Sequence, residues 1–342
     1  MVSNSSRDPI DRYQMECETL SRFCRVTQRP AVMIHQRDPG LAAAFDAAGM
    51  TELLDDQGLV RHGKGEGMVV GLALAQLTGR RYVGFVDADN YVPGAVHEYV
   101  KAYAAGFHLA VTPYSMVRIS WRTKPKIVKN RIFFNRWGRT SQVTNHFLNL
   151  LVADYSAFGT ELIATGNAGE HAISMELARR MRFGSGYSVE PYEYLYLFEE
   201  YGGVLEARHP EVIKAGVEVF QIETRNPHFH EDKGSDHVEE MRVQALNVLY
   251  HSPISTPAVK EEIVAFLREH QQLEAGDEPA RERIYPAIET MDAGVFASVL
   301  ADRATTFRQL REERITHEAP GEPPIVVEEL TAPTDEPGSS GA

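Results

Sequence analysis

The chain has 342 residues, 43% of them hydrophobic and 24% charged, with a formal net charge of −13 at pH 7. These values are typical of a globular protein, and the length is large for one compact domain and small for two. No run approaches the roughly 20 apolar residues of a membrane span and no secretory signal opens the chain, so we expect no membrane partner.

The two cysteines predict a reducing, cytoplasmic location. Cys17 and Cys24 share a helical pattern, two turns apart, which separates their positions by about 10 Å. That distance is too long for a disulfide, and unpaired structural thiols are typical of the cytoplasm.

The elements predicted for the first half alternate between strands and helices. Asp8 and Pro9 are expected to cap and begin the first helix. Strands are expected at residues 1–6, 31–35, 82–86 and 109–119, and further helices at 40–50, 64–77 and 93–105. This alternation predicts an α/β fold with a mostly parallel sheet and helices on both faces.

The second half is more helical. Helices are expected at residues 142–154, 169–181 and 191–201, and one strand or two at 211–223. The chain therefore divides into a main domain (1–235), an amphipathic helical appendage (236–311) and an acidic, Pro-rich tail (312–342) that is expected to be disordered.

The most informative stretch is YVGFVDADNYVPG at residues 82–94, where an apolar strand ends in Asp87 and Asp89. Ligands of open α/β sheets bind beyond the carboxyl ends of strands, and Mg²⁺ takes one or two carboxylates together with substrate phosphates. The pattern predicts a metal–diphosphate site, the DxD arrangement of glycosyltransferases that use sugar nucleotides.

Two other interpretations of this stretch stay open. Asp87, Asp89 and Glu98 occupy positions one, three and twelve of an EF-hand loop, but Val92 stands at position six, where the turn needs glycine. The stretch would otherwise be a solvated acidic turn.

A basic block lies inside this acidic chain. Residues 99–153 hold no Asp or Glu, but they hold nine Lys or Arg residues, from Lys101 to Arg139. Such a block indicates a bound anion. Two small phosphorylated substrates fit better than nucleic acid, for which no module is recognisable, and a solvated basic face is the remaining alternative.

Three further segments are candidates for anion binding or for the reacting end. RHGKGEG at 61–67 precedes an apolar helix, so its glycines and Lys64 suit a phosphate. Thr165 and Asn167 are capping residues ahead of the helix expected from 169. Tyr187 and Glu190 precede the next helix, where Glu190 could also be an ordinary first-turn carboxylate.

Two histidines follow the last predicted strand. His228 and His230 face the same side of an extended chain, and one of them could complete a metal shell with Asp89. No cysteine lies nearby, which argues against structural zinc.

Taken together, these segments resemble mannosyl-3-phosphoglycerate synthases through most of residues 2–249. The specific pieces are GKGEGM at 63–68, YVGFVDADNYVPGAV at 82–96, GRTSQVTN at 138–145, GNAGEHA at 166–172, GYSVEPYEY at 186–194 and TRNPHFHEDKG at 224–234. The family has an earlier strand–helix unit with a nucleotide-binding turn, and this chain begins at the following strand.

The resemblance implies a glycosyltransferase-A fold and a retaining transfer of mannose from GDP-mannose to the 2-hydroxyl of 3-phosphoglycerate, for mannosylglycerate synthesis. It implies a divalent cation (Mg²⁺, Mn²⁺ or Co²⁺) and allows a homodimer. It assigns the donor to Lys64 and Asp87, the metal to Asp89 with His228 or, as second choice, His230, the acceptor to Arg139, Thr140, Thr165, Gly166, Asn167 and Ala168, and the reacting end to Tyr187 and Glu190.

Three other functions are alternatives to this one. A glucosyl-3-phosphoglycerate synthase would use the same chemistry with a glucose nucleotide. A sugar-nucleotide pyrophosphorylase would need an N-terminal Gly-rich signature, which this chain lacks. A non-enzymatic anion-binding module would need neither Asp89 nor a metal.

Overall fold

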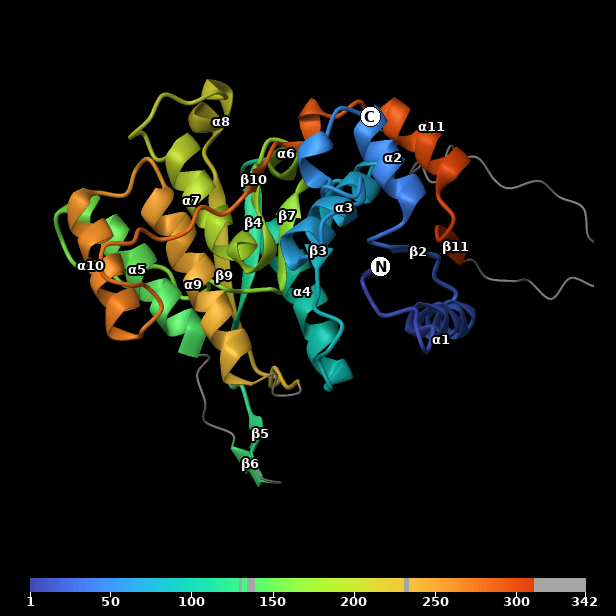
Figure 1. Ribbon diagram of the computed structural model, residues 1–342, viewed down its shortest axis with the longest axis horizontal. Helices are drawn as coiled ribbons and strands as arrows, with labels where there is room; N and C mark the ends of the chain where they lie inside the picture. The colour runs from blue at the N-terminus through green and yellow to red at the C-terminus, as the bar shows by residue number, and fades with distance from the viewer. Residues whose placement is uncertain (129–130, 134–138, 231–233, 311–342) are drawn as a thin grey trace, which may run out of the picture. The chain divides into compact units, whose positions relative to one another are not determined.

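The structure, a computed structural model, describes residues 1–128, 131–133, 139–230 and 234–310 (Figure 1). The described chain packs as two compact units. Unit 1 consists of Met1–Val60, Val70–Arg81 and the chain from Met291 onward, and unit 2 consists of Arg61–Val69 and Tyr82–Thr290. Unit 2 runs through residue 235 and includes helices that the sequence analysis assigned to an appendage; the predicted domain boundaries stay predictions.

Unit 1 is built around a small sheet in the order β1-β2-β11. Its elements are β1 (Val2–Ser3), α1 (Arg12–Thr27), β2 (Ala31–His35), α2 (Pro39–Ala47), the 3₁₀ turn η1 (Thr51–Leu53), α11 (Ala293–Arg303) and β11 (Arg308–Leu310). Asp38 ties these together, because its carboxylate caps α2 at the N–H of Gly40 and also accepts the N–H and hydroxyl of Thr306, both at 2.6 Å.

Unit 2 holds the remaining elements, and α3 (Lys64–Gln76) begins in it. They are β3 (Tyr82–Phe85), α4 (Pro93–Leu109), β4 (Ser115–Trp121), β5 (Lys126–Val128), β6 (Arg131–Phe133), α5 (Arg139–Ser156), β7 (His171–Ser174), α6 (Met175–Ala178), β8 (Phe183–Gly184), η2 (Gly186–Ser188), α7 (Val189–Tyr201), α8 (Pro210–Ala215), β9 (Glu218–Thr224), α9 (Ser235–His251), α10 (Pro257–Glu269), β10 (Ile284–Tyr285) and η3 (Ile288–Thr290).

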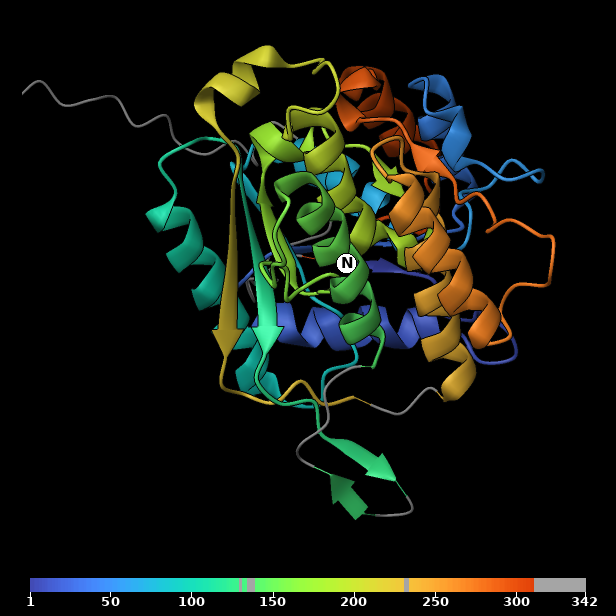
Figure 2. The same cartoon turned by 90° about the vertical axis from the view of Figure 1, so that its left-hand side faces the viewer.

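The central sheet of unit 2 has the order β3-β7-β4-β9. β7 is antiparallel to both of its neighbours, whereas β4 and β9 are parallel. Three of the four strands therefore share one direction. Figure 2 shows β4 and β9 side by side, with α4 on one side of the sheet and α5 and α9 on the other.

Strand alternation divides the two faces of this sheet. Val117, Ile119 and Ala172 point to one face, where they form a core with Tyr99 and Tyr103 of α4. Successive strand residues face opposite ways, and so Arg118 and His171, which are paired in register, point to the other face. That face lies against α7 and carries the polar site.

The predicted α/β class is confirmed. The strand at 31–35 has the expected bounds, and α3, β3 and α5 agree with their predictions within a few residues. The expected disordered tail lies outside the described residues.

Four predictions about individual elements are wrong. α1 is capped by Asp11 rather than Asp8, residues 109–114 precede β4 instead of belonging to it, and 211–223 contains α8 before β9. Residues 169–181 form a strand and a four-residue helix rather than one helix, because β7 is buried between β3 and β4, and sheet pairing outweighs local propensity.

Candidate active site

The ammonium group of Lys64, at the first residue of α3, lies between two carboxylates. Its Nζ is 2.9 Å from Asp87 Oδ2, just beyond the end of β3, and 2.7 Å from Glu190 Oε1 in the first turn of α7. Burial would lower the pKa of Lys64, but the two carboxylates outweigh burial and raise the pKa well above its ordinary value. Lys64 is therefore a fixed positive charge at neutral pH.

Gly169 allows this cluster to form. A Cβ atom at that position would lie 2.5 Å from Lys64 Nζ and 2.6 Å from Asp87 Oδ2, which no side chain could tolerate without displacing the pair. The segment before β7 thus passes directly over the Lys64–Asp87 ion pair.

The loop Thr165–Ala168 comes before β7 and is buried. The hydroxyl of Thr165 lies 2.7 Å from the hydroxyl of Tyr194 and donates to Gln221 Oε1 at 2.8 Å, and the N–H of Gly166 donates to Asn145 Oδ1 at 2.7 Å. These residues are on a loop that precedes a strand, so the predicted capping of a helix by Thr165 and Asn167 is wrong.

Asn167 differs from its neighbours in this loop. Its side chain is buried, and neither its amide oxygen nor its amide nitrogen has a hydrogen-bond partner among the described residues. Buried polar groups in proteins are nearly always hydrogen-bonded to protein, water or ligand. Asn167 therefore offers one donor group and one acceptor group to a bound molecule.

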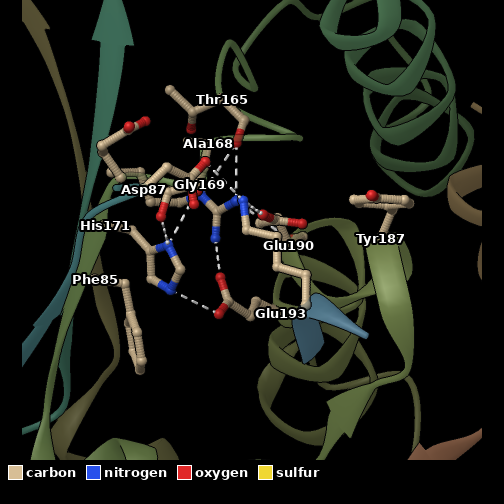
Figure 3. Close-up of polar contacts among 12 residues, drawn as sticks. Phe85, Asp87, Thr165, Ala168, Gly169, His171, Tyr187, Glu190 and Glu193 are labelled. Carbon is tan, nitrogen blue, oxygen red and sulfur yellow. Dashed lines mark hydrogen bonds and ion pairs between the residues drawn. The ribbon is translucent and has the colours of Figure 1, made fainter. Parts of the chain in front are cut away.

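A fully buried cluster of three residues lies beneath the loop (Figure 3). Arg118 Nε and Nη2 donate to the carbonyl oxygen of Thr165 at 3.1 and 2.9 Å, and Arg118 Nη1 pairs with Glu193 Oε2. Glu193 Oε1 lies 2.9 Å from His171 Nε2. Burial would raise the pKa of Glu193, but His171 and Arg118 outweigh burial and lower it, so this carboxyl group is ionised.

The loop that follows β9 lies beside the DxD turn. The N–H of Tyr91 donates to the carbonyl oxygen of Phe229 at 2.7 Å, which brings the segment with His228 and His230 next to the residues after Asp89. Glu98 of α4 holds the same loop, because its carboxylate accepts the backbone N–H groups of residues 225 and 226 at 2.8 Å each. Glu98 is thus a loop anchor, which disfavours the EF-hand interpretation.

A second buried carboxylate faces this loop. Glu170 Oε1 is 3.5 Å from His228 Nδ1, and both side chains are buried. Burial, followed by the negative charge of Asp87, raises the pKa of Glu170 to about 8. The raised pKa favours the protonated form of Glu170 at neutral pH, so the two buried groups approach each other without an ion pair between a carboxylate and an imidazolium.

The other predicted residues lie on nearby elements of unit 2. Tyr187 is in η2, where its N–H donates to Gln244 Oε1 at 2.7 Å and its ring meets His237 edge-on. Thr140 is buried in the first turn of α5, and its hydroxyl donates to the carbonyl oxygen of Val238 at 3.5 Å. Arg139 begins α5, but its side chain lies outside the described residues.

Comparisons with known proteins identify the family. A family model described as mannosyl-3-phosphoglycerate synthase matches residues 1–300. The mannosyl-3-phosphoglycerate synthase of Pyrococcus furiosus is 48% identical over 309 residues, which cover 90% of this chain and 78% of that protein. The chain belongs to the mannosyl-3-phosphoglycerate synthase family.

A second relative of the same name agrees. The mannosyl-3-phosphoglycerate synthase of Aeropyrum pernix is 34% identical over 307 residues, covering 90% of this chain and 78% of that protein. A solved structure of glucosyl-3-phosphoglycerate synthase from Mycobacterium tuberculosis, in complex with phosphoglyceric acid, is 16% identical with a TM-score of 0.46 and covers 84% of this chain and 77% of that chain.

Membership of the mannosyl-3-phosphoglycerate synthase family confirms the prediction that this chain is an enzyme and a glycosyltransferase. In the part of the chain that the structure describes, no helix is long and apolar enough to cross a membrane.

The structure brings together Lys64, Asp87 and Glu190. Local sequence patterns placed Lys64 and Asp87 at a phosphate site, and the family resemblance placed Glu190 at the reacting end. Four residues of this region were missed: Arg118, Glu170, His171 and Glu193. Arg118 was counted only as part of a basic block, and the GEH and EPYE letters around the others were quoted as family motifs. Their signal in the sequence is weak, since the pairs that they form join separate elements.

Proposed function

We propose that this chain transfers mannose from GDP-mannose to the 2-hydroxyl of 3-phosphoglycerate, with retention of configuration, giving mannosyl-3-phosphoglycerate. The observation that carries the proposal is the placement of Lys64 between Asp87 and Glu190 at the DxD strand end. In a mannosyl-3-phosphoglycerate synthase this is the position where a sugar nucleotide would present its diphosphate.

Lys64 and Asp87 would hold the donor. The leaving group is a nucleoside diphosphate, so negative charge builds on its β-phosphate as the glycosidic bond breaks. A preorganised cation aimed at developing charge stabilises the transition state more than the ground state. The protonated Lys64, held in place by Glu190, supplies that charge.

Asp89 and His228, with His230 as the second choice for the histidine, would hold a divalent cation. Carboxylate donors suit Mg²⁺ and Mn²⁺, and an imidazole donor favours a transition metal such as Mn²⁺ or Co²⁺. When bound, the cation would act as a Lewis acid on the diphosphate.

The described side chains form no group of three or more His, Cys, Asp or Glu residues that could hold a metal by themselves. That arrangement suits a cation that takes part of its shell from substrate phosphates and water, as Mg²⁺ commonly does.

The loop Thr165–Ala168, together with Arg139 and Thr140, would hold the anionic groups of 3-phosphoglycerate. The structural support for this assignment is the pair of buried amide atoms of Asn167, which have no hydrogen-bond partner among the described residues. Tyr187 and Glu190 would line the reacting end, where Glu190 already contacts Lys64.

The proposed chemistry needs no protein base. The bond from the sugar C1 to the diphosphate oxygen breaks, the bond from C1 to the acceptor O2 forms on the same face, and the hydroxyl proton passes to the departing diphosphate. Glu190 and Lys64 orient and neutralise in this scheme; they do not form a covalent intermediate.

The test is product formation by the purified chain. 3-Phosphoglycerate and Mg²⁺ are supplied with GDP-mannose or with a glucose nucleotide in separate reactions, and NMR reads the anomeric configuration of the product. α-Mannosyl transfer supports the proposal. Glucosyl transfer would select the glucosyl-3-phosphoglycerate reading, an inverted product would reject retention, and absence of any transfer would reject the function.

A further inference from the structure

The cluster of Arg118, Glu193 and His171 has a geometry that the transfer reaction itself does not require. All three side chains are fully buried. Burying charged groups is costly unless they are paired. The groups that these three side chains contact show which part of the structure they support.

His171 contacts both the loop and Glu193. Its Nδ1 lies 3.0 Å from the carbonyl oxygen of Ala168 and 3.1 Å from that of Gly169, and carbonyl oxygens only accept hydrogen bonds, so Nδ1 is the donor. Its Nε2 lies 2.9 Å from a carboxylate oxygen of Glu193. The imidazole ring therefore bridges the loop backbone and Glu193.

The same cluster holds the loop backbone at both ends. Arg118 donates two hydrogen bonds to the carbonyl oxygen of Thr165, and His171 Nδ1 lies beside the carbonyl oxygens of Ala168 and Gly169 at the other end of the loop. The loop backbone is thus fastened at both ends by buried side chains.

The same cluster reaches the helix that orients Lys64. Arg118 Nη2 donates to the carbonyl oxygen of Glu190 at 3.2 Å. Glu190 and Glu193 (Figure 3) are three residues apart and share one face of α7. One helical turn therefore presents a carboxylate to Lys64 and another to Arg118 and His171.

We propose that Arg118, Glu193 and His171 form a positioning unit for the acceptor: a buried polar cluster, centred on the Arg118–Glu193 ion pair, that fixes the shape of the loop Thr165–Gly169 on which an anionic ligand would lie. The inference rests on the proposed function for the identity of that ligand, 3-phosphoglycerate. None of the three residues contacts the reacting atoms.

The experiment compares Glu193→Gln with Glu199→Gln. Glu199 is a matched control, because it is a buried glutamate of the same helix, paired with Arg182 at 3.1 Å, with no contact to the loop among the interactions described. Amide hydrogen exchange of residues 165–169, calorimetric binding of 3-phosphoglycerate and the steady-state KM of both substrates are measured for both variants and the unaltered chain.

For Glu193→Gln we expect faster exchange in the loop and a rise of about 10- to 100-fold in the KM and Kd for 3-phosphoglycerate, which is the scale of effect of misplacing a substrate-holding group. The KM for GDP-mannose should stay close to that of the unaltered chain. Glu199→Gln should change thermal stability but neither the loop exchange nor the acceptor KM.

Equal loop exchange and equal acceptor affinity in the two variants would overturn the proposal. If Glu193→Gln does not fold, His171→Gln keeps the Arg118–Glu193 pair and must show the same loss at the loop. Loop exchange needs no turnover, so an inactive chain with the expected exchange pattern would reject the proposed function and leave this inference standing.

Discussion

Helix α7 carries two cation–carboxylate clusters one turn apart, and they differ in exposure. In the Lys64 cluster, the side chains of Lys64 and Asp87 are 23% and 36% exposed. In the Arg118 cluster, Arg118, Glu193 and His171 are 0% exposed. The Lys64 cluster is the exposed cluster, and its ion pair can exchange partners with a ligand. The Arg118 cluster is the sealed cluster, and it holds the backbone around it. Exposure, more than charge type, separates a binding role from a supporting role.

The strongest challenge to a binding role for the exposed region is Asp89→Ala. Because Asp89 would supply the cation with its carboxylate, we expect this variant to lose transfer and metal dependence while its melting temperature stays unchanged. Steady-state assays across a Mg²⁺ and Mn²⁺ series measure the effect, with the exposed Asp56→Ala as control. Unchanged turnover would favour a metal-free or non-enzymatic function.

The supporting role of the sealed cluster predicts a large stability loss for Arg118→Met. Removing one partner of a buried ion pair typically costs about 3–5 kcal/mol, since the remaining charge is left uncompensated. Urea denaturation followed by circular dichroism gives the free energy of unfolding. A loss close to that of an exposed arginine would show that the sealed cluster does not hold the fold.

Replacing Lys64 by methionine should reduce catalysis more than stability, in contrast to Arg118→Met. Lys64→Met removes a charge aimed at the leaving group, so kcat should fall by about 10²- to 10³-fold. Its stability loss should be smaller than that of Arg118→Met, because Lys64 is partly solvated. Lys214→Met, at an exposed lysine of α8, is the control. A kcat within threefold of the control would contradict the proposed role of Lys64 in stabilising the leaving group.

The smallest expected effect is a contrast in pH dependence between two buried glutamates. The lowered pKa of Glu193 gives stability that is present above its ordinary pKa of 4.5 and is lost as pH falls through the folded-state value. Burial raises the pKa of Glu66, so the stability linked to Glu66 is present below pH 4.5 and is lost as pH rises through its folded-state value.

Melting curves from about pH 3 to pH 8 test this linkage. Glu193→Gln should flatten the acid side of the stability profile, and Glu66→Gln, which keeps an acceptor for the hydroxyl of Tyr285, should flatten the side toward neutral pH. Parallel profiles for both variants and the unaltered chain would contradict the assignment.

The exposed cluster could be predicted from the sequence because its members stand at the ends of strands and helices. Asp87 follows an apolar strand, and Lys64 follows glycines and begins an apolar helix, so local patterns placed each of them. The strand at 31–35 was predicted for the same reason, since a short apolar run between turn residues has few other solutions.

The sealed cluster could not be predicted from the sequence because it depends on pairing between strands that are far apart in the chain. His171 and Arg118 meet only when β7 inserts between β3 and β4. The strand HAIS and the helix MELA are four residues each, too short to show a period of their own. Together they imitate one helix, which is why residues 169–181 were assigned wrongly.

The hydrogen bonds that Glu98 accepts from the loop after β9 affect the kinetics of ligand binding. Three hydrogen bonds at 2.8 Å fasten residues 225 and 226 to α4, so the chain before His228 loses its conformational freedom during folding rather than during ligand capture. An incoming ligand meets a loop already in place, and the entropy of ordering it does not oppose binding. Association is then expected to follow a single exponential with a rate linear in ligand concentration, without the saturating phase that a slow loop rearrangement would impose.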